Sequence, residues 1–180
     1  IHELYCEPTG KFAHNPEPLP ENLSALSSEV KQQKADIGIA VDPDVDRLAL
    51  IDEQGVPFGE EYTLVAVADY VLAHKKGNTV SNLSSTKALR DISEKHGVLY
   101  SASAVGEVNV VEKMKETNAV IGGEGNGGII LPELHYGRDA LVGIALFLSH
   151  LATSNKSMNS LRAQYPNYVI SKNKIQLEEG

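Results

Sequence analysis

Residues 42–47 read Asp-Pro-Asp-Val-Asp-Arg and carry the side chains whose types and spacing most directly indicate chemistry. They follow the apolar segment 37–41, which is typical of a buried strand. Asp42, Asp44 and Asp46 stand at every second position, so their carboxylates can converge on one divalent cation. Hard cations such as Mg²⁺ take oxygen ligands and commonly share phosphate with them. Because Arg47 adds a planar guanidinium suited to phosphate, the run predicts metal-assisted phosphoryl chemistry.

Three other interpretations of this run stay open at the level of the residues. An EF-hand loop would use these aspartates and also Glu53, but Arg47 stands where that loop needs glycine, and the flanks are strand-like. A haloacid-dehalogenase-type phosphatase also places two aspartates after a buried strand, although its motif continues with Thr or Val where this chain has Asp46. A solvated acidic turn is disfavoured because closely spaced carboxylates repel one another without a cation.

A second group of polar residues lies in the glycine-rich segment 122–128, Gly-Gly-Glu-Gly-Asn-Gly-Gly. Three of its glycines match the Gly-x-Gly-x-x-Gly dinucleotide fingerprint as a string. That fingerprint opens a helix, however, whereas residues 129–131 are typical of extended chain. We expect a loop whose glycines let the backbone approach a ligand while Glu124 and Asn126 bind sugar hydroxyls. A tight turn with incidental polar residues is the alternative.

Composition argues against several partners. The net charge of −8, without a cluster of Lys and Arg, argues against nucleic acid, and no apolar run approaches membrane-spanning length. The six histidines show no paired metal-ligand spacing. Cys6 is the single cysteine, which fits a reducing cytoplasm, and we expect it in the core. The chain starts with Ile1 inside a strand-like segment, so we expect a piece of a longer protein.

Strands and helices that alternate along the chain are expected to position these loops. Strands are predicted at 2–6, 36–41, 47–52, 79–83, 98–101, 119–122 and 129–131, and helices at 21–34, 61–76, 85–96, 107–115, 139–151 and 157–165, with a strand-like tail at 168–177. The helix 61–76 is predicted to be amphipathic and to stop at Gly77. Ser85 and Asp139 are predicted to cap helices at their starts, and Gly97 and Asn118 to end them. This order predicts an α/β fold with a largely parallel sheet and a boundary at 57–60.

The two polar segments, in this order and about eighty residues apart, resemble the α-D-phosphohexomutases: phosphoglucomutase, phosphomannomutase and phosphoglucosamine mutase. In that family an Asp-x-Asp-x-Asp-Arg loop holds Mg²⁺, and a Gly-Glu-x-Ser-Gly-type loop in the next domain binds the sugar. Residues 12–23, FAHNPEPLPENL, resemble the stretch that precedes the metal loop. Residues 104–114 resemble the segment before the sugar loop. The resemblance covers most of residues 1–155.

The resemblance implies a role for each of six side chains: Mg²⁺ ligation by Asp42, Asp44 and Asp46, catalytic contact of Arg47 with substrate near the transferring phosphoryl, and binding of sugar hydroxyls by Glu124 and Asn126. Asn126 stands where many relatives have serine, and Gly128 where many have histidine. Some relatives carry a basic residue near the positions of Asn82 and Glu107, so no proton shuttle is assigned.

The resemblance also implies a three-layer α/β/α fold with a mixed, largely parallel sheet, plus part of a second similar domain. Residues 1–58 would be the latter part of domain II with the metal loop. Residues 59–180 would be domain III with the sugar loop, ending in a helical and strand-like tail from about residue 157.

The family mechanism uses a phosphoserine that this chain does not show. The phosphoserine gives its phosphoryl to a sugar phosphate, and the bisphosphate reorients and returns the second phosphate to serine. Ala13 precedes His14-Asn15-Pro16 where a serine would be needed, and no Arg-x-Ser-Gly-Thr loop occurs near the C-terminus. In the family these parts belong to domains I and IV.

We therefore expect the central fragment of a cytoplasmic, Mg²⁺-dependent phosphohexomutase that moves phosphate between the 1- and 6-positions of a hexose phosphate. Its partners would be hexose phosphate, hexose bisphosphate, and domains I and IV of the same polypeptide. The isolated chain is expected to be inactive. A non-catalytic module that binds phosphosugar and metal is the main alternative, followed by the phosphatase.

Overall fold

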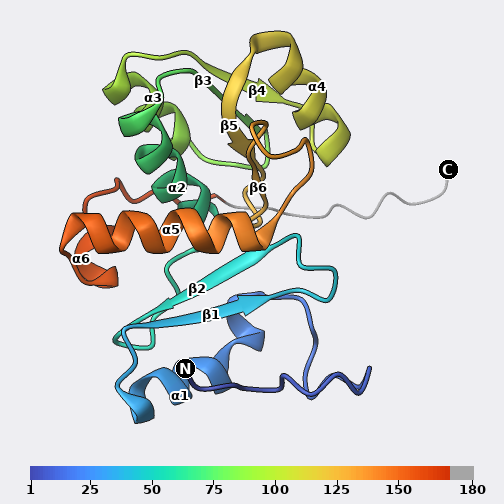
Figure 1. The fold of residues 1–180 in the computed structure, drawn as a ribbon, viewed down its shortest axis with the longest axis vertical. Helices are drawn as coiled ribbons and strands as arrows, with labels where there is room; N and C mark the ends of the chain where they lie inside the picture. The colour runs from blue at the N-terminus through green and yellow to red at the C-terminus, as the bar shows by residue number, and fades with distance from the viewer. Residues whose placement is uncertain (171–180) are drawn as a thin grey trace, which may run out of the picture.

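The computed structural model describes residues 1–170 of the chain, and Figure 1 shows the arrangement of its elements. In chain order they are η1 (Pro20–Asn22), α1 (Ser24–Gln33), β1 (Ile37–Val41), β2 (Leu48–Asp52), α2 (Glu60–His74), β3 (Asn78–Asn82), α3 (Ala88–His96), β4 (Tyr100–Ser103), α4 (Glu107–Thr117), β5 (Ala119–Gly123), β6 (Ile129–Ile130), α5 (Ala140–Ser154) and α6 (Met158–Arg162). Most of the predicted tail strand, 168–177, lies outside the described residues.

The larger sheet has the strand order β4-β3-β5-β6. Strand β3 pairs in parallel with β4 and β5, whereas β6 pairs antiparallel with β5. Helix α4 covers one face of this sheet, and α2 and α3 cover the other (Figure 1). Each face has its own core: Val80 and Met114 belong to the cluster under α4, and Ile121 to the cluster under α2 and α3. The predicted three-layer α/β/α fold with a mixed, largely parallel sheet is confirmed.

The hairpin of β1 and β2 is a separate two-stranded antiparallel sheet, paired from Ile37 with Asp52 to Val41 with Leu48. All five residues of β2 are buried, because the strand lies between two apolar clusters. Leu48 and Leu50 belong to the cluster of α2 and α5, and Ala49 and Ile51 to the cluster under α1. Successive side chains of a strand point to opposite faces, so β2 joins the hairpin to the larger layer.

Helix α2 differs from the predicted amphipathic helix. It begins and ends slightly earlier, at Glu60–His74, and nearly every residue from Tyr62 to Leu72 is buried. The side expected to face solvent is covered because α3, α5, β2 and β5 all pack against this helix. A helix enclosed on all sides has no need of a polar stripe. Within residues 1–170, no helix is long and apolar enough to cross a membrane.

Several local predictions are wrong. Residues 2–6 form no strand, because Tyr5 has a φ of 56° that interrupts an extended run, and Cys6 is exposed rather than in the core. Ser85 does not cap α3, since its hydroxyl donates to Asn82 and the helix begins only at Ala88.

The predicted stop of α2 at Gly77 is also wrong, because the helix ends earlier, with Lys75 as its C-cap. The helix caps predicted at Asp139, Gly97 and Asn118 are confirmed. Asp139 caps α5 by accepting a hydrogen bond from the backbone of Val142, at 3.0 Å. Gly97 and Asn118 adopt the left-handed conformation that closes α3 and α4.

Candidate functional site

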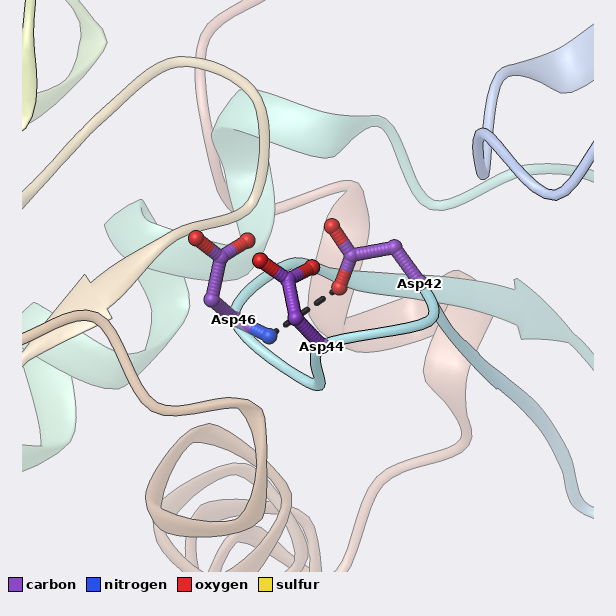
Figure 2. A group of neighbouring side chains, drawn as sticks. All are labelled: Asp42, Asp44 and Asp46. Atoms are coloured by element: carbon purple, nitrogen blue, oxygen red, sulfur yellow. Dashed lines mark hydrogen bonds between the residues drawn. The ribbon is translucent and has the colours of Figure 1, made fainter.

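The turn between β1 and β2 brings three aspartates together, as Figure 2 shows. Asp42 follows β1 directly, and its Oδ1 accepts hydrogen bonds from the backbone amides of Asp46 and Arg47, both at 3.0 Å. Its carbonyl oxygen accepts from the backbone of Val45, whose φ is 58°. The buried carboxylate of Asp42 thus organises the loop and turns the following acidic side chains to the same side.

The three carboxylates fit a hard divalent cation. One ligand oxygen from each of Asp42, Asp44 and Asp46 can be chosen so that all lie within 4.8 Å of one another. Asp42 Oδ2 and Asp46 Oδ1 are buried and have no hydrogen-bond partner among the described residues, and the ion-pair partner that they share is the Arg47 guanidinium, whose Nε lies 3.0 Å and 3.7 Å from them. A single guanidinium shared between two carboxylates leaves net negative charge that suits a divalent cation. Because the flanking elements are strands, the loop is not an EF-hand.

Burial and local charge push the pKa values of two of these carboxylates apart. Burial alone would raise the pKa of Asp42, but hydrogen bonds from the backbone of Arg47 and Asp46 outweigh it and hold the pKa below its usual value. For Asp46, burial and the neighbouring Asp42 raise the pKa to about 6, against the opposing charge of Arg138. Neighbouring groups whose pKa values diverge in this way are typical of functional sites.

Arg47 points from the end of the acidic loop toward a cavity. Its Nε lies 3.0 Å from Asp42 Oδ2, and its Nη1 lies 3.1 Å from Glu17 Oε1. The cavity has a volume of 220 Å³ and is lined by Glu17, Pro18, Leu19, Arg47, Glu60 and Asn126. The proline-rich segment before α1 therefore forms one wall, and Arg47 and Asn126 face the same space.

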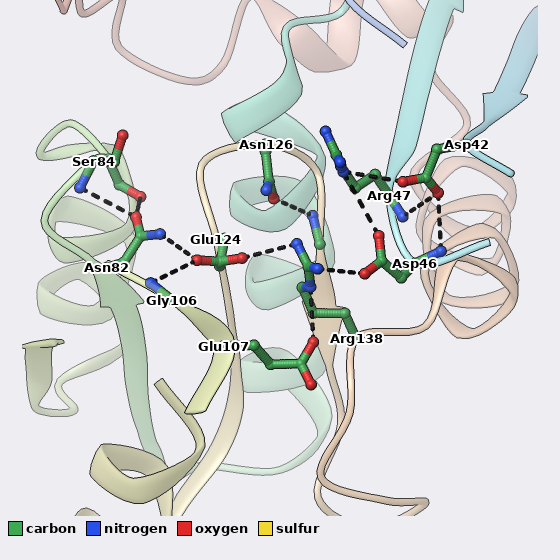
Figure 3. Close-up of polar contacts among 12 residues, drawn as sticks. Asp42, Asp46, Arg47, Asn82, Ser84, Gly106, Glu107, Glu124, Asn126 and Arg138 are labelled. Carbon is green, nitrogen blue, oxygen red and sulfur yellow. Dashed lines mark hydrogen bonds and ion pairs between the residues drawn. The ribbon is translucent and has the colours of Figure 1, made fainter. Parts of the chain in front are cut away.

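The second predicted site loop connects β5 to β6. Glu124 is buried, and its Oε1 accepts hydrogen bonds from Asn82 Nδ2 at 2.7 Å and from the Gly106 amide at 3.3 Å (Figure 3). Asn126 Oδ1 accepts from the Gly128 amide at 3.2 Å, which fixes the side-chain amide within the loop. Because residues 129–130 form a strand, the dinucleotide-fold interpretation is excluded.

Gly127 allows the glycine-rich loop to pack directly against β2. Its φ is 86°, and a Cβ there would overlap the carbonyl oxygen of Leu48. The Gly127 carbonyl oxygen accepts a hydrogen bond from the Leu48 amide at 3.2 Å. At this position the close approach is therefore to β2 and not to a ligand, and it holds the glycine-rich loop 122–128 beside the acidic loop 42–47.

The sequence analysis missed Arg138, which connects the two loops. Its guanidinium donates to Asp46, Glu124 and Glu107 (Figure 3). Burial acts to lower the pKa of Arg138, but the three carboxylates raise it above its usual value. One signal was available, because Arg138 is the only arginine between residues 91 and 161 and directly precedes the helix cap Asp139.

Two family models match consecutive parts of the chain. The model of the phosphoglucomutase/phosphomannomutase α/β/α domain III matches residues 59–168, and the model of domain II matches residues 1–55. The chain belongs to the α-D-phosphohexomutase family. The resemblance identified from the two loops is thus confirmed.

Individual phosphohexomutases match over nearly the whole chain. A phosphoglucomutase/phosphomannomutase from Thermococcus kodakarensis is 37% identical over 187 residues, which cover 99% of this chain and 41% of the relative. A phosphoglucosamine/phosphogalactosamine mutase from Sulfurisphaera tokodaii is 33% identical, over 93% of this chain and 38% of the relative. The crystal structure of a phosphoglucomutase/phosphomannomutase family protein from Burkholderia thailandensis superposes with a TM-score of 0.76 at 26% identity, over 87% of this chain and 34% of that one. The chain spans about two fifths of the length of these curated phosphohexomutases.

Proposed function

We propose that this chain supplies the metal-binding and sugar-binding parts of a Mg²⁺-dependent phosphohexomutase that moves phosphate between the 1- and 6-positions of a hexose phosphate. Residues 1–58 would be the latter part of domain II, and residues 59–180 domain III. Domains I and IV of the same polypeptide would contribute the phosphoserine and a phosphate-binding loop. A cytoplasmic location is a further part of the proposal and rests on the single cysteine.

The observation that carries the proposal is a pair of buried carboxylate oxygens, Asp42 Oδ2 and Asp46 Oδ1, that have no hydrogen bond among the described residues and share one ion-pair partner, Arg47, which also lines the neighbouring cavity. Asp42, Asp44 and Asp46 would hold Mg²⁺, and the bound ion would offset negative charge on the phosphoryl oxygens.

The remaining roles belong to groups that line or border the cavity. Arg47 would bind the phosphoryl group through its guanidinium, after leaving its partly exposed ion pair with Glu17. Asn126 has its Oδ1 engaged by the loop, so its NH₂ group is oriented to donate to a sugar hydroxyl. The Glu124 carboxylate accepts three hydrogen bonds from the protein and retains acceptor capacity for one hydroxyl. Substrates would be hexose phosphates and hexose bisphosphates.

A first experiment tests the metal site. Titration of the chain with Mn²⁺, followed by electron paramagnetic resonance, should give one site, and Asp44→Asn should weaken binding at least about tenfold. Asp44 is exposed and organises nothing else in the loop, so this variant keeps the fold. Asp36→Asn, at another exposed aspartate outside the loop, is the matched control. Equal Mn²⁺ affinity in both variants would contradict the assignment.

A second experiment separates the enzyme from a non-catalytic binding module. The isolated chain, supplied with glucose 1-phosphate, Mg²⁺ and a hexose bisphosphate primer, should bind sugar phosphate without isomerising it. The longer polypeptide should isomerise glucose, mannose or glucosamine phosphate, and comparing the three gives the preferred substrate. Isomerisation by the isolated chain would overturn the proposed division of labour. An inactive longer polypeptide that still binds phosphosugar would favour the binding module, and trapping of an aspartyl-phosphate analogue at Asp42 would favour a phosphatase.

A further inference from the structure

Arg138 makes a three-way connection that the roles above do not use. It lies between β6 and α5, and its side chain is only 16% exposed. Nε donates to Glu107 Oε2 at 2.8 Å, Nη1 donates to Glu124 Oε2 at 2.8 Å, and Nη2 donates to Asp46 Oδ2 (Figure 3). Each nitrogen of the guanidinium therefore holds a different carboxylate.

The three partners come from separate elements. Asp46 lies in the loop after β1, Glu124 follows β5, and Glu107 is in the first turn of α4. The planar guanidinium is rigid, so the directions of its three N–H groups fix the relative positions of these carboxylates. A lysine ammonium keeps the charge but is a compact point charge on a flexible stem and lacks this fork.

Arg138 holds one oxygen of Asp46 and one oxygen of Glu124. Asp46 Oδ2 is held by Arg138, while Asp46 Oδ1 is buried without a hydrogen bond at the proposed metal site. Glu124 Oε2 is held by Arg138, while Oε1 is held by Asn82 and Gly106. The same guanidinium thus orients a metal ligand and a sugar ligand.

The backbone around Arg138 is also hydrogen-bonded to the acidic loop and to β6, the strand that follows the glycine-rich loop. The Ala140 amide donates to the Val45 carbonyl oxygen inside the acidic loop, at 3.0 Å, and the Asp139 amide donates to Ile129 at 2.9 Å. The side chain packs so closely on position 128 that a Cβ there would overlap Arg138 Cδ. The backbone beside Arg138 and the middle of its side chain are thus both held in place. A shift of Asp46 must therefore reorient the guanidinium, and with it the other carboxylates that the guanidinium binds.

We propose that Arg138 is a positioning residue that couples the cation site to the sugar site: a divalent cation bound at Asp46 changes the orientation of Glu124 through the shared guanidinium. The proposal rests on the proposed function for the identity of the two ligands. It adds that the sugar loop responds to the cation before any sugar is present.

The test is nuclear magnetic resonance of the ¹⁵N-labelled 180-residue chain during titration with Mg²⁺ alone. In the wild-type chain, the amide of Asp44 should shift as the ion binds. The Nε–H of Arg138 and the amides of Gly106 and Asn126 should shift with the same midpoint. If Arg138 only holds the structure together, Mg²⁺ should leave the resonances of the sugar loop unchanged.

A substitution at Arg138 then separates the effect of the planar guanidinium from that of its positive charge. In Arg138→Lys, the Asp44 amide should still respond, with a midpoint about tenfold higher in Mg²⁺, while the shifts at Gly106 and Asn126 should be lost. Arg90→Lys, the same change at an exposed arginine on α3, should behave as wild type. The wild-type titration can refute the coupling even if the Arg138 variant does not fold.

The outcomes distinguish this inference from the proposed function. If Asp44 responds to Mg²⁺ but Arg138 and the sugar loop do not, the coupling is wrong and the metal site stands. If the sugar loop still responds in Arg138→Lys, the fork is not what carries the coupling. If Asp44 itself does not respond, both the metal site and the coupling are wrong.

Discussion

Asp69 offers a quantitative test of how the α/β/α layer is held together. This buried carboxylate on α2 lies 2.6 Å from Nε2 of His96 and 3.2 Å from Nζ of Lys95, both at the end of α3. It also accepts a hydrogen bond from the hydroxyl of Tyr165, beyond α6, at 3.3 Å. The substitution Asp69→Asn keeps the shape of the side chain and removes the charge that these three donors share.

The expected loss of stability follows from the exposure of each partner. The contact with His96 is largely buried, so it is worth about 1.5–3 kcal/mol as a hydrogen bond to a charged group. The side chain of Lys95 is 61% exposed, which limits that ion pair to roughly 0.5 kcal/mol. The long Tyr165 contact adds about 0.5 kcal/mol. We expect Asp69→Asn to lower the free energy of unfolding by about 3 kcal/mol, and Tm by about 6–12 °C for a chain of this size.

The loss should depend on pH in a defined direction. Burial alone would raise the pKa of Asp69, but the hydrogen bond from His96 and the charge of Lys95 hold it below its usual value. A carboxylate with a lowered pKa in the folded state stabilises the protein above its unfolded pKa of about 3.9, and this contribution is lost as pH falls through the folded value. The difference between wild type and variant should therefore be full at pH 7 and shrink progressively below about pH 4.

The measurement is urea denaturation followed by circular dichroism at pH 7, 5 and 3, with Asp36→Asn as the control for removal of an exposed carboxylate. A loss below about 1 kcal/mol at pH 7 would mean that solvent replaces the three donors at little cost and that the network does not hold α2 to α3. A loss that persists unchanged at pH 3 would refute the assignment of the effect to the ionised carboxylate.

Three further changes have defined outcomes. Thr63→Val should leave stability unchanged or raise it by up to about 1 kcal/mol in urea denaturation, because the buried Thr63 hydroxyl has no hydrogen-bond partner among the described residues; a loss above this size would reveal a partner. Gly127→Ala should destabilise by at least about 2 kcal/mol, since φ is 86° and the new Cβ overlaps the Leu48 carbonyl oxygen; an unchanged Tm would show that the loop relaxes freely. Glu17→Gln should strengthen glucose 6-phosphate binding by about two- to fivefold in calorimetry, by releasing Arg47 from a half-exposed ion pair, and high salt should reduce the gain.

The local parts of the candidate site could be predicted from sequence because their signals lie within a few residues. The acidic loop is built from contiguous residues, and Asp42 closes it with hydrogen bonds to amides four and five residues later. The pattern of apolar residues also predicted the strand before this loop and the extended residues after the glycine-rich loop. The individual roles assigned to Arg47, Glu124 and Asn126 stay predictions.

What could not be predicted depends on partners far away in the chain. Arg138 meets Asp46 across 92 residues and Glu107 across 31, and no local pattern encodes such a pairing. The enclosure of α2 was missed for the same reason, because α3, α5, β2 and β5 all pack against a helix of which one face was assigned to solvent by periodicity. Cys6 was placed in the core by its apolar neighbours, although no buried cluster of the described chain includes that segment.

The burial of β2 between two apolar clusters bears on whether this chain can be divided. The family models change near residues 55–59, yet Leu48 and Leu50 lie before that point and pack with α2 and α5 beyond it. A cut there would expose both leucines, at about 1.5–3 kcal/mol for each fully buried side chain. The hairpin and the larger layer should therefore melt in one cooperative transition. Two segments that match different family models would then form a single folding unit. A metal loop transplanted into another protein would therefore need the residues of α2 and α5 that pack against Leu48 and Leu50.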